Sequence, residues 1–290
     1  MQFTINSAAV ICFILFVCML IAKRLRHNTF SLFPTLIANW SKLGFCSITT
    51  GIILQRYFLE NHYLILCILI GVLIFILVET ILLWMKISSI NYALSQINEV
   101  NKEIENAWSC DKNAIKLKHN IEKLGLKKAQ AYESFVSDIP SAKSTAFDSS
   151  DKKIRLTVSF LHGEEKSIAT TALSITQEGK FIITTNYPNP VFPYPDTWYV
   201  QQYPMKINPI KIFKSHKKYI DSIDEDIAPI TESPLNLEKR TSEEQEIFAR
   251  KAGFIHNKAD VNDYGLLTNE ALFWFWINSI KLDYFPFLYK

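Results

Sequence analysis

The side chains best suited to acid–base chemistry in this sequence are two histidines and a glutamate. His162 and Glu164 fall in a predicted turn after a strand, and His216 follows a proline-rich segment farther along the chain. An imidazole paired with a carboxylate can act as a general base, so these three catalytic candidates would suit a hydrolase. A histidine in a turn is more often simply solvated. We therefore favour a non-enzymatic protein and keep a hydrolase as the alternative.

The sequence predicts no metal site and no cofactor site. Residues 260–265 carry Asp, Asn and Gly at the first, third and sixth positions of a calcium-binding loop. Tyr264 at position five and Ala271 at position twelve do not fit the ligand pattern, and Glu270 falls one residue short of closing it. The motifs HExxH, GxSxG, GxxxxGK[ST] and GxGxxG are absent. Outside the apolar stretches Cys110 is the single cysteine, which excludes a disulfide framework and a structural zinc site there.

The two parts of the chain, residues 1–85 and 86–290, differ in their content of charged side chains. The chain has 290 residues, with 31 basic and 28 acidic side chains, and residues 1–85 hold only five of the basic and two of the acidic ones. The apolar first third excludes a wholly soluble enzyme, and the long polar remainder excludes a polytopic transporter. Residues 86–290 carry no net charge. Because a nucleic-acid-binding domain would show a basic excess, no nucleic-acid partner is expected.

Three apolar stretches are candidates for membrane spans within a membrane domain at residues 1–86. The strongest, 63–85, has about 23 residues, enough to cross a hydrocarbon core of about 30 Å. The stretch at about 3–22 is followed at once by basic residues, the reverse of a cleaved signal peptide, and is predicted to be an uncleaved anchor. The third, 43–59, is borderline because four polar side chains dilute it.

Two topologies follow from these stretches. With two spans the C-terminal part of the chain is external, and with three spans it is cytoplasmic. Three spans leave Arg56 outside and keep the other basic residues of this region inside: Lys23, Arg24, Arg26, Lys42 and Lys86. This arrangement agrees better with the positive-inside rule. We therefore expect an integral protein of the plasma (inner) membrane with a cytoplasmic soluble domain.

The geometry of a helical hairpin also predicts an ion pair in the membrane domain. If 43–59 and 63–85 form a tight antiparallel hairpin, the helix rise places Glu79 opposite Lys42. An acidic side chain this deep in a span is costly unless it is paired. We expect a Lys42–Glu79 pair near the inner boundary. The alternative is that Glu79 reaches the interface without a special partner.

Residues 87–140 are predicted to form a helical stalk or hairpin. Its first helix has a heptad seam with one asparagine: Ile87, Ile90, Leu94, Ile97, Asn101, Ile104 and Trp108. A lone asparagine in such a seam fixes the register of a parallel coiled coil, so Asn101 predicts a homodimer. The alternative is an amphipathic helix that packs on its own domain. A second helix is expected from residue 114 to Val136, with a pause at Gly125.

The remainder, 141–290, is predicted to be a small soluble domain, which makes the fold class α+β. After a polar linker at 141–153, alternating apolar residues indicate three strands at 154–160, 167–176 and 181–185. Short turns separate these strands, and an antiparallel meander is the natural arrangement.

Two helices are predicted near the C-terminus. Ser242 begins a capping box for the first helix, which ends at Gly253. Thr268 caps the second, 269–282, whose core LFWFWI is apolar on every side. We expect this core to be buried in the domain, with a partner-binding face as the alternative.

A basic stretch precedes these helices. Its lysines are Lys206, Lys211, Lys214, Lys217 and Lys218. In a cytoplasmic domain such a patch could rest on anionic lipid, at about 1 kcal/mol for each cation near the surface. The acidic run at 221–226 offsets the patch, so a solvated helix face is favoured.

Together these patterns favour a membrane-anchored, non-enzymatic interaction protein that presents its α+β domain to an unknown protein partner. Its predicted contacts are the lipid bilayer, that partner and a second copy of the chain. The alternatives are a membrane-tethered hydrolase that uses His162, Glu164 and His216, or a membrane sensor that signals through a dimeric stalk.

Overall fold

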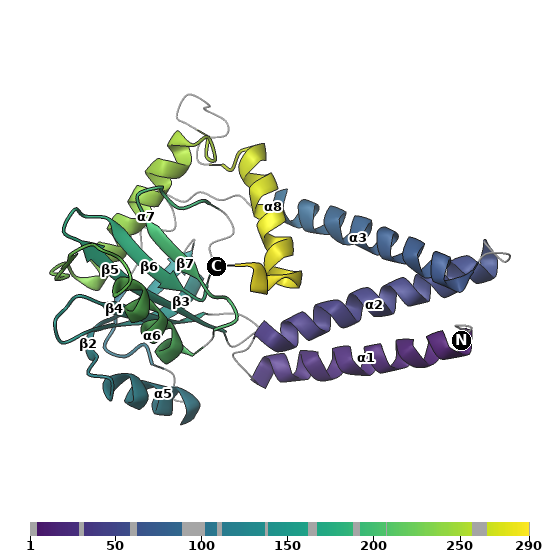
Figure 1. Ribbon diagram of the computed structural model, residues 1–290, viewed down its shortest axis with the longest axis horizontal. Coiled ribbons are helices and arrows are strands. Elements are labelled where there is room, and N and C mark those ends of the chain that lie inside the picture. The colour runs from purple at the N-terminus through teal and green to yellow at the C-terminus, as the bar shows by residue number, and fades with distance from the viewer. Residues whose placement is uncertain are drawn as a thin grey trace. The chain divides into compact units, whose positions relative to one another are not determined.

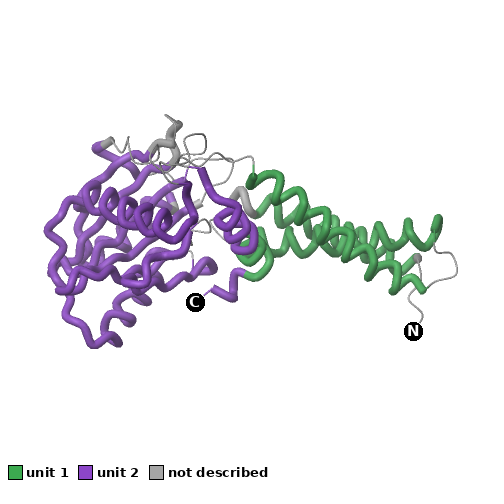
Figure 2. Tube along the Cα trace, turned by 90° about the horizontal axis from the view of Figure 1, so that it is seen from above, with its two compact units in different colours: residues 1–90, 279–285 green, residues 91–278, 286–290 purple. Residues whose placement is uncertain are grey.

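The computed structural model describes residues 5–28, 32–58, 63–88, 102–108, 112–136, 139–161, 167–187, 192–206, 208–256 and 266–289. The chain divides into two compact units (Figure 2). The helical unit comprises residues 1–90 and 279–285, and the α+β unit comprises 91–278 and 286–290.

The helical unit contains three long helices, α1 (Ile5–Asn28), α2 (Leu32–Tyr57) and α3 (Leu64–Ser88). Helix α2 packs against both α1 and α3 (Figure 1). Two helices of the described chain are long and apolar enough to cross a membrane: α1 through Asn6–Leu25 and α3 through Leu64–Ser88. Most of the predicted third stretch lies within α2, which ends at Tyr57. The helix begins about ten residues earlier than expected, and this added part contains the polar side chains Asn39, Ser41 and Lys42.

Small residues let α2 and α3 approach closely. Gly51 of α2 and Gly71 of α3 are buried at this contact, together with Ser47 and Cys67. A methyl group on Gly71 would overlap the Ser47 carbonyl oxygen, and one on Gly51 would lie 2.7 Å from Ile68 Cα. Both obstacles are backbone atoms, so the spacing between these helices depends on the absence of side chains at the two glycines.

The α+β unit is built on an eight-stranded sheet with the strand order β1-β2-β3-β4-β5-β6-β7, in which β8 pairs with β5. All neighbouring strands are antiparallel except β6 and β7, which are parallel. The strands are β1 (Lys102–Glu103), β2 (Lys127–Val136), β3 (Ile139–Asp148), β4 (Arg155–Leu161), β5 (Ser167–Thr176), β6 (Phe181–Thr185), β7 (Tyr199–Gln202) and β8 (Ile227–Ala228).

The described residues of this part of the chain also form helices α5 (Lys112–Glu122), α6 (Pro209–Ile220), α7 (Pro234–Lys251) and α8 (Asn269–Tyr284), and the 3-10 turn η1 (Pro286–Leu288). Helix α6 packs on β4, β5 and β6, whereas α7 contacts β2 (Figure 1). Helix α8 runs through the α+β unit until residue 278, and its last turn belongs to the helical unit.

Helices α6 and α7 cover opposite faces of the sheet: Ser174 of β5 contacts His216 of α6, whereas the next residue back, Leu173, lines a pocket with residues of α7. In β4, Leu156 and Val158 are fully buried on the α6 side. Arg155, Thr157 and Ser159 lie on the α7 side. Both sides mix apolar and buried polar residues: Ser174, Thr184 and His216 lie on the α6 side, and Arg155 lies on the α7 side beside the apolar cluster of Phe181, Trp198 and Leu237.

The predicted meander and the α+β class are confirmed. Strands β4, β5 and β6 coincide with the predicted strands to within one residue. The second C-terminal helix also begins as expected, since Thr268 Oγ1 accepts a hydrogen bond from Ala271 N. The first begins nine residues earlier than predicted: Ser233, not Ser242, is the N-cap, with Pro234 at the start of the helix.

The predicted helical segment after Gly125 is wrong, and so is the linker at 141–153. Gly125 has φ +81° and ends the turn after α5, after which the chain forms strands β2 and β3. Ala131 and Tyr132 are buried in β2 and pair with Thr145 and Ser144 of β3. Pairing and burial decide strand formation here over the helix-compatible composition of Lys127–Val136.

The end of the predicted stalk is not helical. Ile104 donates a backbone hydrogen bond to Ala131 O, and Trp108 packs edge-to-face on Phe147 and Phe160 of the sheet. The middle of the seam, including Asn101, lies outside the described residues. The homodimer therefore stays a prediction. The last heptad of the predicted stalk cannot contribute to it, because Ile104 and Trp108 contact the sheet.

The apolar core of α8 is only partly buried, contrary to expectation. Ala271, Leu272 and Phe275 pack into a cluster with residues of α7 and its neighbours. Phe273 and Trp274 are 52% and 41% exposed. A helix that is apolar on every side can bury only the stripe that faces its own domain, and here the opposite stripe remains uncovered within the described structure.

Candidate functional site

His216, the described member of the predicted catalytic group, is a buried structural residue. Its Nδ1 lies 2.9 Å from Thr184 Oγ1, and its Nε2 lies 3.1 Å from Ser174 Oγ. Because the Ser174 hydroxyl donates to Lys153 O, Ser174 Oγ accepts from His216 Nε2–H, and Nδ1 accepts from Thr184. The ring is fully buried, so no substrate reaches it. His162, Glu164 and the calcium-like segment 260–265 lie outside the described residues.

Burial keeps His216 neutral, and this predicts a pH dependence of stability. Desolvation lowers the pKa of His216 from 6.5 to about 3. Below pH 6.5 the unfolded chain takes up a proton that the folded protein refuses, so stability falls by at most about 1.4 kcal/mol per pH unit until about pH 3. Between pH 6.5 and 5.0, we expect His216→Gln to remove this part of the loss, because glutamine also hydrogen-bonds but does not titrate.

Pulse proteolysis of the full chain in mild detergent at both pH values would measure this difference. The wild type and His216→Gln should diverge in their pH slopes even if the variant is somewhat less stable at pH 7. Equal slopes would show that His216 does not titrate as this geometry requires.

The predicted basic patch lies on the outer side of α6, opposite His216. Lys211, Lys214, Lys217 and Lys218 are exposed. Lys206 differs from them: its Nζ donates to Ser215 Oγ and lies 3.4 Å from the centre of the Tyr203 ring. Burial, followed by repulsion from two neighbouring lysines, lowers the pKa of Lys206.

One acidic side chain of the run at 221–226 pairs away from α6. Glu225, one member of that run, accepts hydrogen bonds from Lys180 Nζ at 3.1 Å and from Tyr199 Oη at 2.8 Å. It therefore neutralises Lys180 rather than a lysine of α6.

The helical unit contains the expected charge pair. Lys42 Nζ lies 2.7 Å from Glu79 Oε2 and 3.0 Å from Glu79 Oε1, and it also lies 5.6 Å from the Phe75 ring centre. Because both carboxylate oxygens are engaged, the two charges neutralise each other on the apolar surfaces of α2 and α3.

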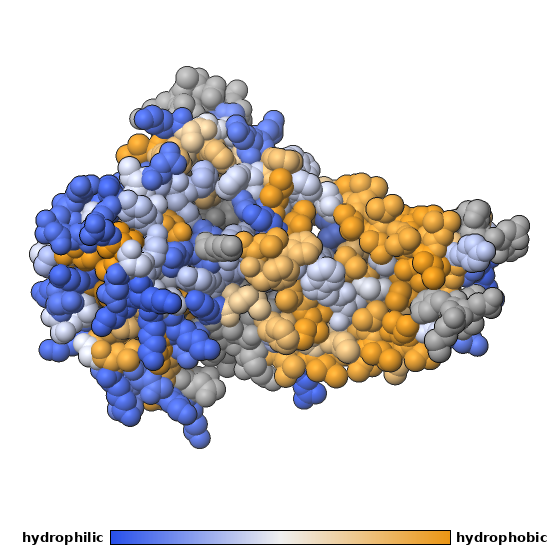
Figure 3. All heavy atoms as spheres, in the orientation of Figure 1, coloured by the Kyte–Doolittle hydropathy of each residue, from blue (hydrophilic) through white to orange (hydrophobic). Residues whose placement is uncertain are grey.

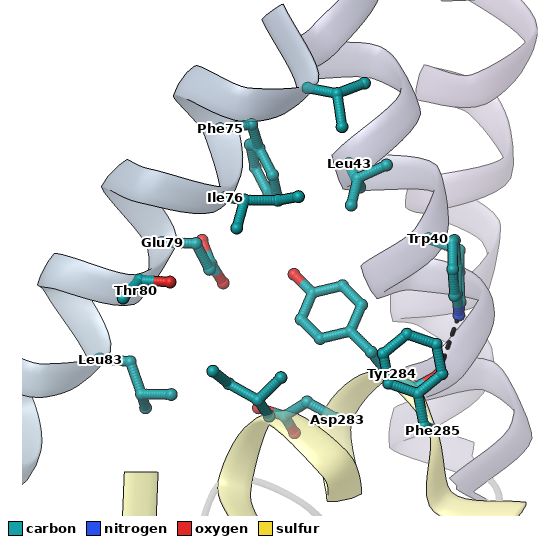
Figure 4. Close-up of a pocket in the computed structure, with 12 residues that line it drawn as sticks. Trp40, Leu43, Phe75, Ile76, Glu79, Thr80, Leu83, Asp283, Tyr284 and Phe285 are labelled. Carbon is teal, nitrogen blue, oxygen red and sulfur yellow. Dashed lines mark hydrogen bonds between the residues drawn. The ribbon is translucent and has the colours of Figure 1, made fainter. Parts of the chain in front are cut away.

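Next to this pair is a mostly apolar cavity of about 340 Å³ (Figure 4). Its walls are α2, α3 and the last turn of α8, and the Glu79 carboxylate and Tyr284 hydroxyl point into it. The α8 turn is held by α2: Asn39 Nδ2 donates to Asp283 O, and Trp40 Nε1 donates to Tyr284 O at 3.2 Å. These partners are separated by 244 positions, so no sequence pattern connects them.

A second pocket, of about 170 Å³, lies between α7 and the polar side of the sheet, within the α+β unit. We call it the α7 pocket. Its lining residues are Tyr132, Arg155, Thr157, Ser159, Thr171, Leu173, Pro234, Leu237, Glu238 and Thr241. This site was not predicted from the sequence, because Arg155, Thr157 and Ser159 alternate with apolar residues in a half-buried strand and were expected to face solvent.

An ion pair fixes the floor of the α7 pocket. Arg155 Nε and Nη2 donate to Asp148 Oδ1 and Oδ2 at 2.7 and 2.9 Å, and the arginine side chain is only 5% exposed. Above the floor, the Glu238 carboxylate interacts with the Tyr132 hydroxyl, and burial raises the pKa of both groups. Ser144 and Ser159 share a hydrogen bond of 2.7 Å.

Comparisons of the chain with protein-family models, with curated proteins and with solved structures each found no match.

Proposed function

We propose that this chain is a membrane-anchored, non-enzymatic binding protein. Helices α1, α2 and α3 hold it in the plasma (inner) membrane, and the α+β unit works in the cytoplasm beside the lipid surface. The observation that carries the proposal is the uncovered apolar surface of the long helices.

The apolar side chains of α1 and α3 point outward rather than into a core. Leu73, Leu77 and Met85 of α3 are each more than half exposed, as are Val10 and Phe13 of α1. Apolar side chains also dominate the visible surface of these helices (Figure 3). In water this exposure costs roughly 25 cal/mol for each Å² of apolar surface, whereas a bilayer covers it.

Helix α2 is the proposed third span. It is shielded by contacts with α1 and α3, and its internal cation, Lys42, is neutralised by Glu79. If all three helices span the membrane, Lys23, Arg24 and Lys86 lie at the same end of the helical unit. The chain also leaves α3 toward the α+β unit at this end. The positive-inside rule then places that end in the cytoplasm.

A binding role is favoured over the hydrolase alternative. The described catalytic candidate, His216, is enclosed and has both ring nitrogens occupied by Thr184 and Ser174. Within the α+β unit, Phe273, Trp274 and Ile277 form an exposed apolar stripe on α8. Exposed aromatic side chains of this kind are typical of surfaces that contact another molecule.

Fractionation and cysteine labelling test the anchor and its sidedness. We expect the full chain to remain in the membrane pellet after alkaline carbonate extraction. The background for labelling is a variant whose five cysteines are replaced by serine. A single cysteine is then introduced by Tyr63→Cys, just before α3, or by Lys214→Cys, on α6. An impermeant maleimide should label Tyr63→Cys in intact cells, and Lys214→Cys only after permeabilisation.

The two parts of the proposal fail separately in this experiment. Recovery of the chain in the carbonate supernatant would contradict the anchor. Retention in the pellet with labelling of Lys214→Cys in intact cells would contradict the cytoplasmic placement alone.

A further inference from the structure

The divergence of α2 and α3 leaves a space inside the helical unit. The two helices approach closely at Gly51 and Gly71 and separate toward the N-terminal end of α2 (Figures 1 and 4). The last turn of α8 enters the space between them, where Asn39 and Trp40 hold it to α2. This turn does not fill the space. The cavity of about 340 Å³ beside Glu79 is what remains.

The walls of this cavity are mostly apolar, with an acidic group among them. Its apolar lining residues include Leu43, Val72, Phe75, Ile76, Leu83 and Ile280. Two lining residues are acidic: Glu79 near the middle of α3, and Asp283 in the last turn of α8. Because Asp283 is exposed, its charge can be solvated from outside the cavity. The Glu79 carboxylate is therefore the charged group that an occupant meets between the apolar walls (Figure 4).

The volume of the cavity suits a small lipid-like molecule. About 340 Å³ is at the lower end of the range of roughly 300–1,000 Å³ that is usual for ligand pockets. A water molecule takes up about 30 Å³ in the liquid, so the cavity has room for roughly eleven groups of that size. A methylene group is similar in size. A hydrocarbon body of about ten carbon atoms would therefore fill the cavity.

The Glu79 carboxylate can accept a further hydrogen bond. A carboxylate has about four acceptor positions, and Lys42 Nζ approaches the two oxygens of Glu79 at 3.0 and 2.7 Å. The Tyr284 hydroxyl interacts with the same carboxylate from α8 and is itself shielded by the protein around it. About one acceptor position remains. The Glu79 side chain is 32% exposed and lines the cavity, so a bound molecule can reach it.

The charge of the Lys42–Glu79 pair limits the chemistry of the occupant. Lys42 already balances Glu79, so a ligand with an ammonium group would add an unbalanced positive charge at this position. A ligand with a carboxylate would add a second negative charge beside Glu79. Either charge is costly in the interior of a bilayer. A hydroxyl group, in contrast, donates a strong hydrogen bond to a carboxylate without adding charge.

We propose that this cavity binds a neutral alcohol with a hydrocarbon body of about ten carbons. Its hydroxyl group donates to Glu79, and its hydrocarbon body occupies the space between α2, α3 and the last turn of α8. The ligand reaches the cavity through the hydrocarbon interior of the bilayer. This inference names a ligand class for the proposed membrane-anchored binding protein. It rests on the proposed anchor, because the cost of an added charge is high only within a bilayer.

Photolabelling of the full chain in lipid nanodiscs tests the site. The probe is a ten-carbon primary alcohol with a diazirine at the far end of its chain, and labelled residues are identified by mass spectrometry. We expect saturable labelling of Leu43 and Phe75, which line the cavity. Leu73 and Leu77 are more than half exposed on α3 and do not line it. Their labelling should increase linearly with probe concentration, as expected for contact with bulk lipid.

Competition by unlabelled ten-carbon compounds tests the ligand class. Decanol, decane, decylamine and decanoate are compared at equal concentrations within the bilayer, so that differences in partitioning cancel. A hydrogen bond to a charged acceptor is worth a factor of about ten in affinity, so decanol should compete at about one tenth of the concentration that decane requires. Equal competition by decane would overturn the role of Glu79. Stronger competition by decylamine or decanoate would overturn the assignment of a neutral ligand.

Two isoleucines of α3 form a matched pair for locating the site. Ile76 and Ile74 are 48% and 39% exposed, but only Ile76 lines the cavity. Ile76→Trp places a larger side chain at the wall and should reduce saturable labelling about tenfold, because a tight site tolerates little added volume. Ile74→Trp should be labelled like the wild type. Equal loss in the two variants would contradict the proposed location.

The double variant Lys42→Met/Glu79→Met removes the acceptor without leaving an unpaired charge. It should still be labelled in the cavity, but decanol and decane should now compete equally. A retained advantage for decanol would show that another group accepts the hydroxyl. Failure of the chain to enter nanodiscs would contradict the membrane anchor itself. Entry into nanodiscs with labelling that never saturates at any position would overturn the site alone and leave the cavity to lipid tails.

Discussion

Replacing Gly71 by leucine is expected to separate α2 from α3 and to destroy the packing of the helical unit. Even a single methyl group at this position would overlap the Ser47 carbonyl oxygen, which is part of the α2 backbone and cannot rotate away. Overpacking of this kind costs about 1–3 kcal/mol for a few added atoms, and a leucine adds four carbons. Gly71→Leu should therefore fail to accumulate in the membrane, and Gly71→Ala should accumulate at a reduced level.

Gly44 provides the matched control for this experiment. It also lies in a helix of the same unit, but a methyl group there would meet only the end of the flexible Leu15 side chain, at 2.9 Å. Gly44→Ala should therefore accumulate like the wild type. Membrane levels and resistance to protease can be compared by immunoblotting. Equal tolerance of alanine at Gly44 and Gly71 would contradict the close packing of α2 and α3.

Removing one charge of the Lys42–Glu79 pair should have the second large effect on stability. In Lys42→Met the Glu79 carboxylate loses the ammonium group that lies within 3.0 Å of both its oxygens. An unpaired charge in the interior of a bilayer costs about 2.5–3.5 kcal/mol on insertion scales. The expected position of the pair near the inner boundary is wrong, because α2 begins at Leu32 and Lys42 and Glu79 therefore lie near the middle of α2 and α3. We expect Lys42→Met and Glu79→Met each to lower stability in lipid nanodiscs by about 2–3 kcal/mol.

The charge-swapped variant Lys42→Glu/Glu79→Lys keeps the pair and should recover most of the loss. The double variant Lys42→Met/Glu79→Met removes both charges and should also be more stable than either single variant. A double-mutant cycle measured by pulse proteolysis gives the coupling between the two residues. A coupling near zero would show that each charge reaches the membrane interface independently.

The sequence anticipated this ion pair because helix geometry is regular. Once two apolar stretches are joined by a short turn, the constant rise per residue determines which positions face each other. The same regularity identified β4, β5 and β6, whose apolar residues alternate and whose turns are short. In both cases the partners are neighbours along the chain, and few alternative pairings compete.

Strands β2 and β3 were missed because their local sequence does not favour a strand. The segment Lys127–Val136 contains lysine, alanine, glutamine and glutamate, which are compatible with a helix. Its strand conformation is stabilised by pairing with Ile139–Asp148 and by burial of Tyr132 under α7. That contact involves residues about 100 positions away, and local periodicity carries no information about it.

The amino-acid sequence by itself determined the membrane-compatible helices, the neutral charge of the remainder, the α+β class and the strands with regular alternation. Each of these depends on the backbone period or on composition. Only the tertiary structure decided that His216 is enclosed, that Arg155 lies beneath α7 rather than in solvent, and that Trp40 holds the carbonyl of Tyr284. These outcomes depend on which distant segment covers a residue, and the period of a strand or helix specifies the direction of a side chain but not what covers it.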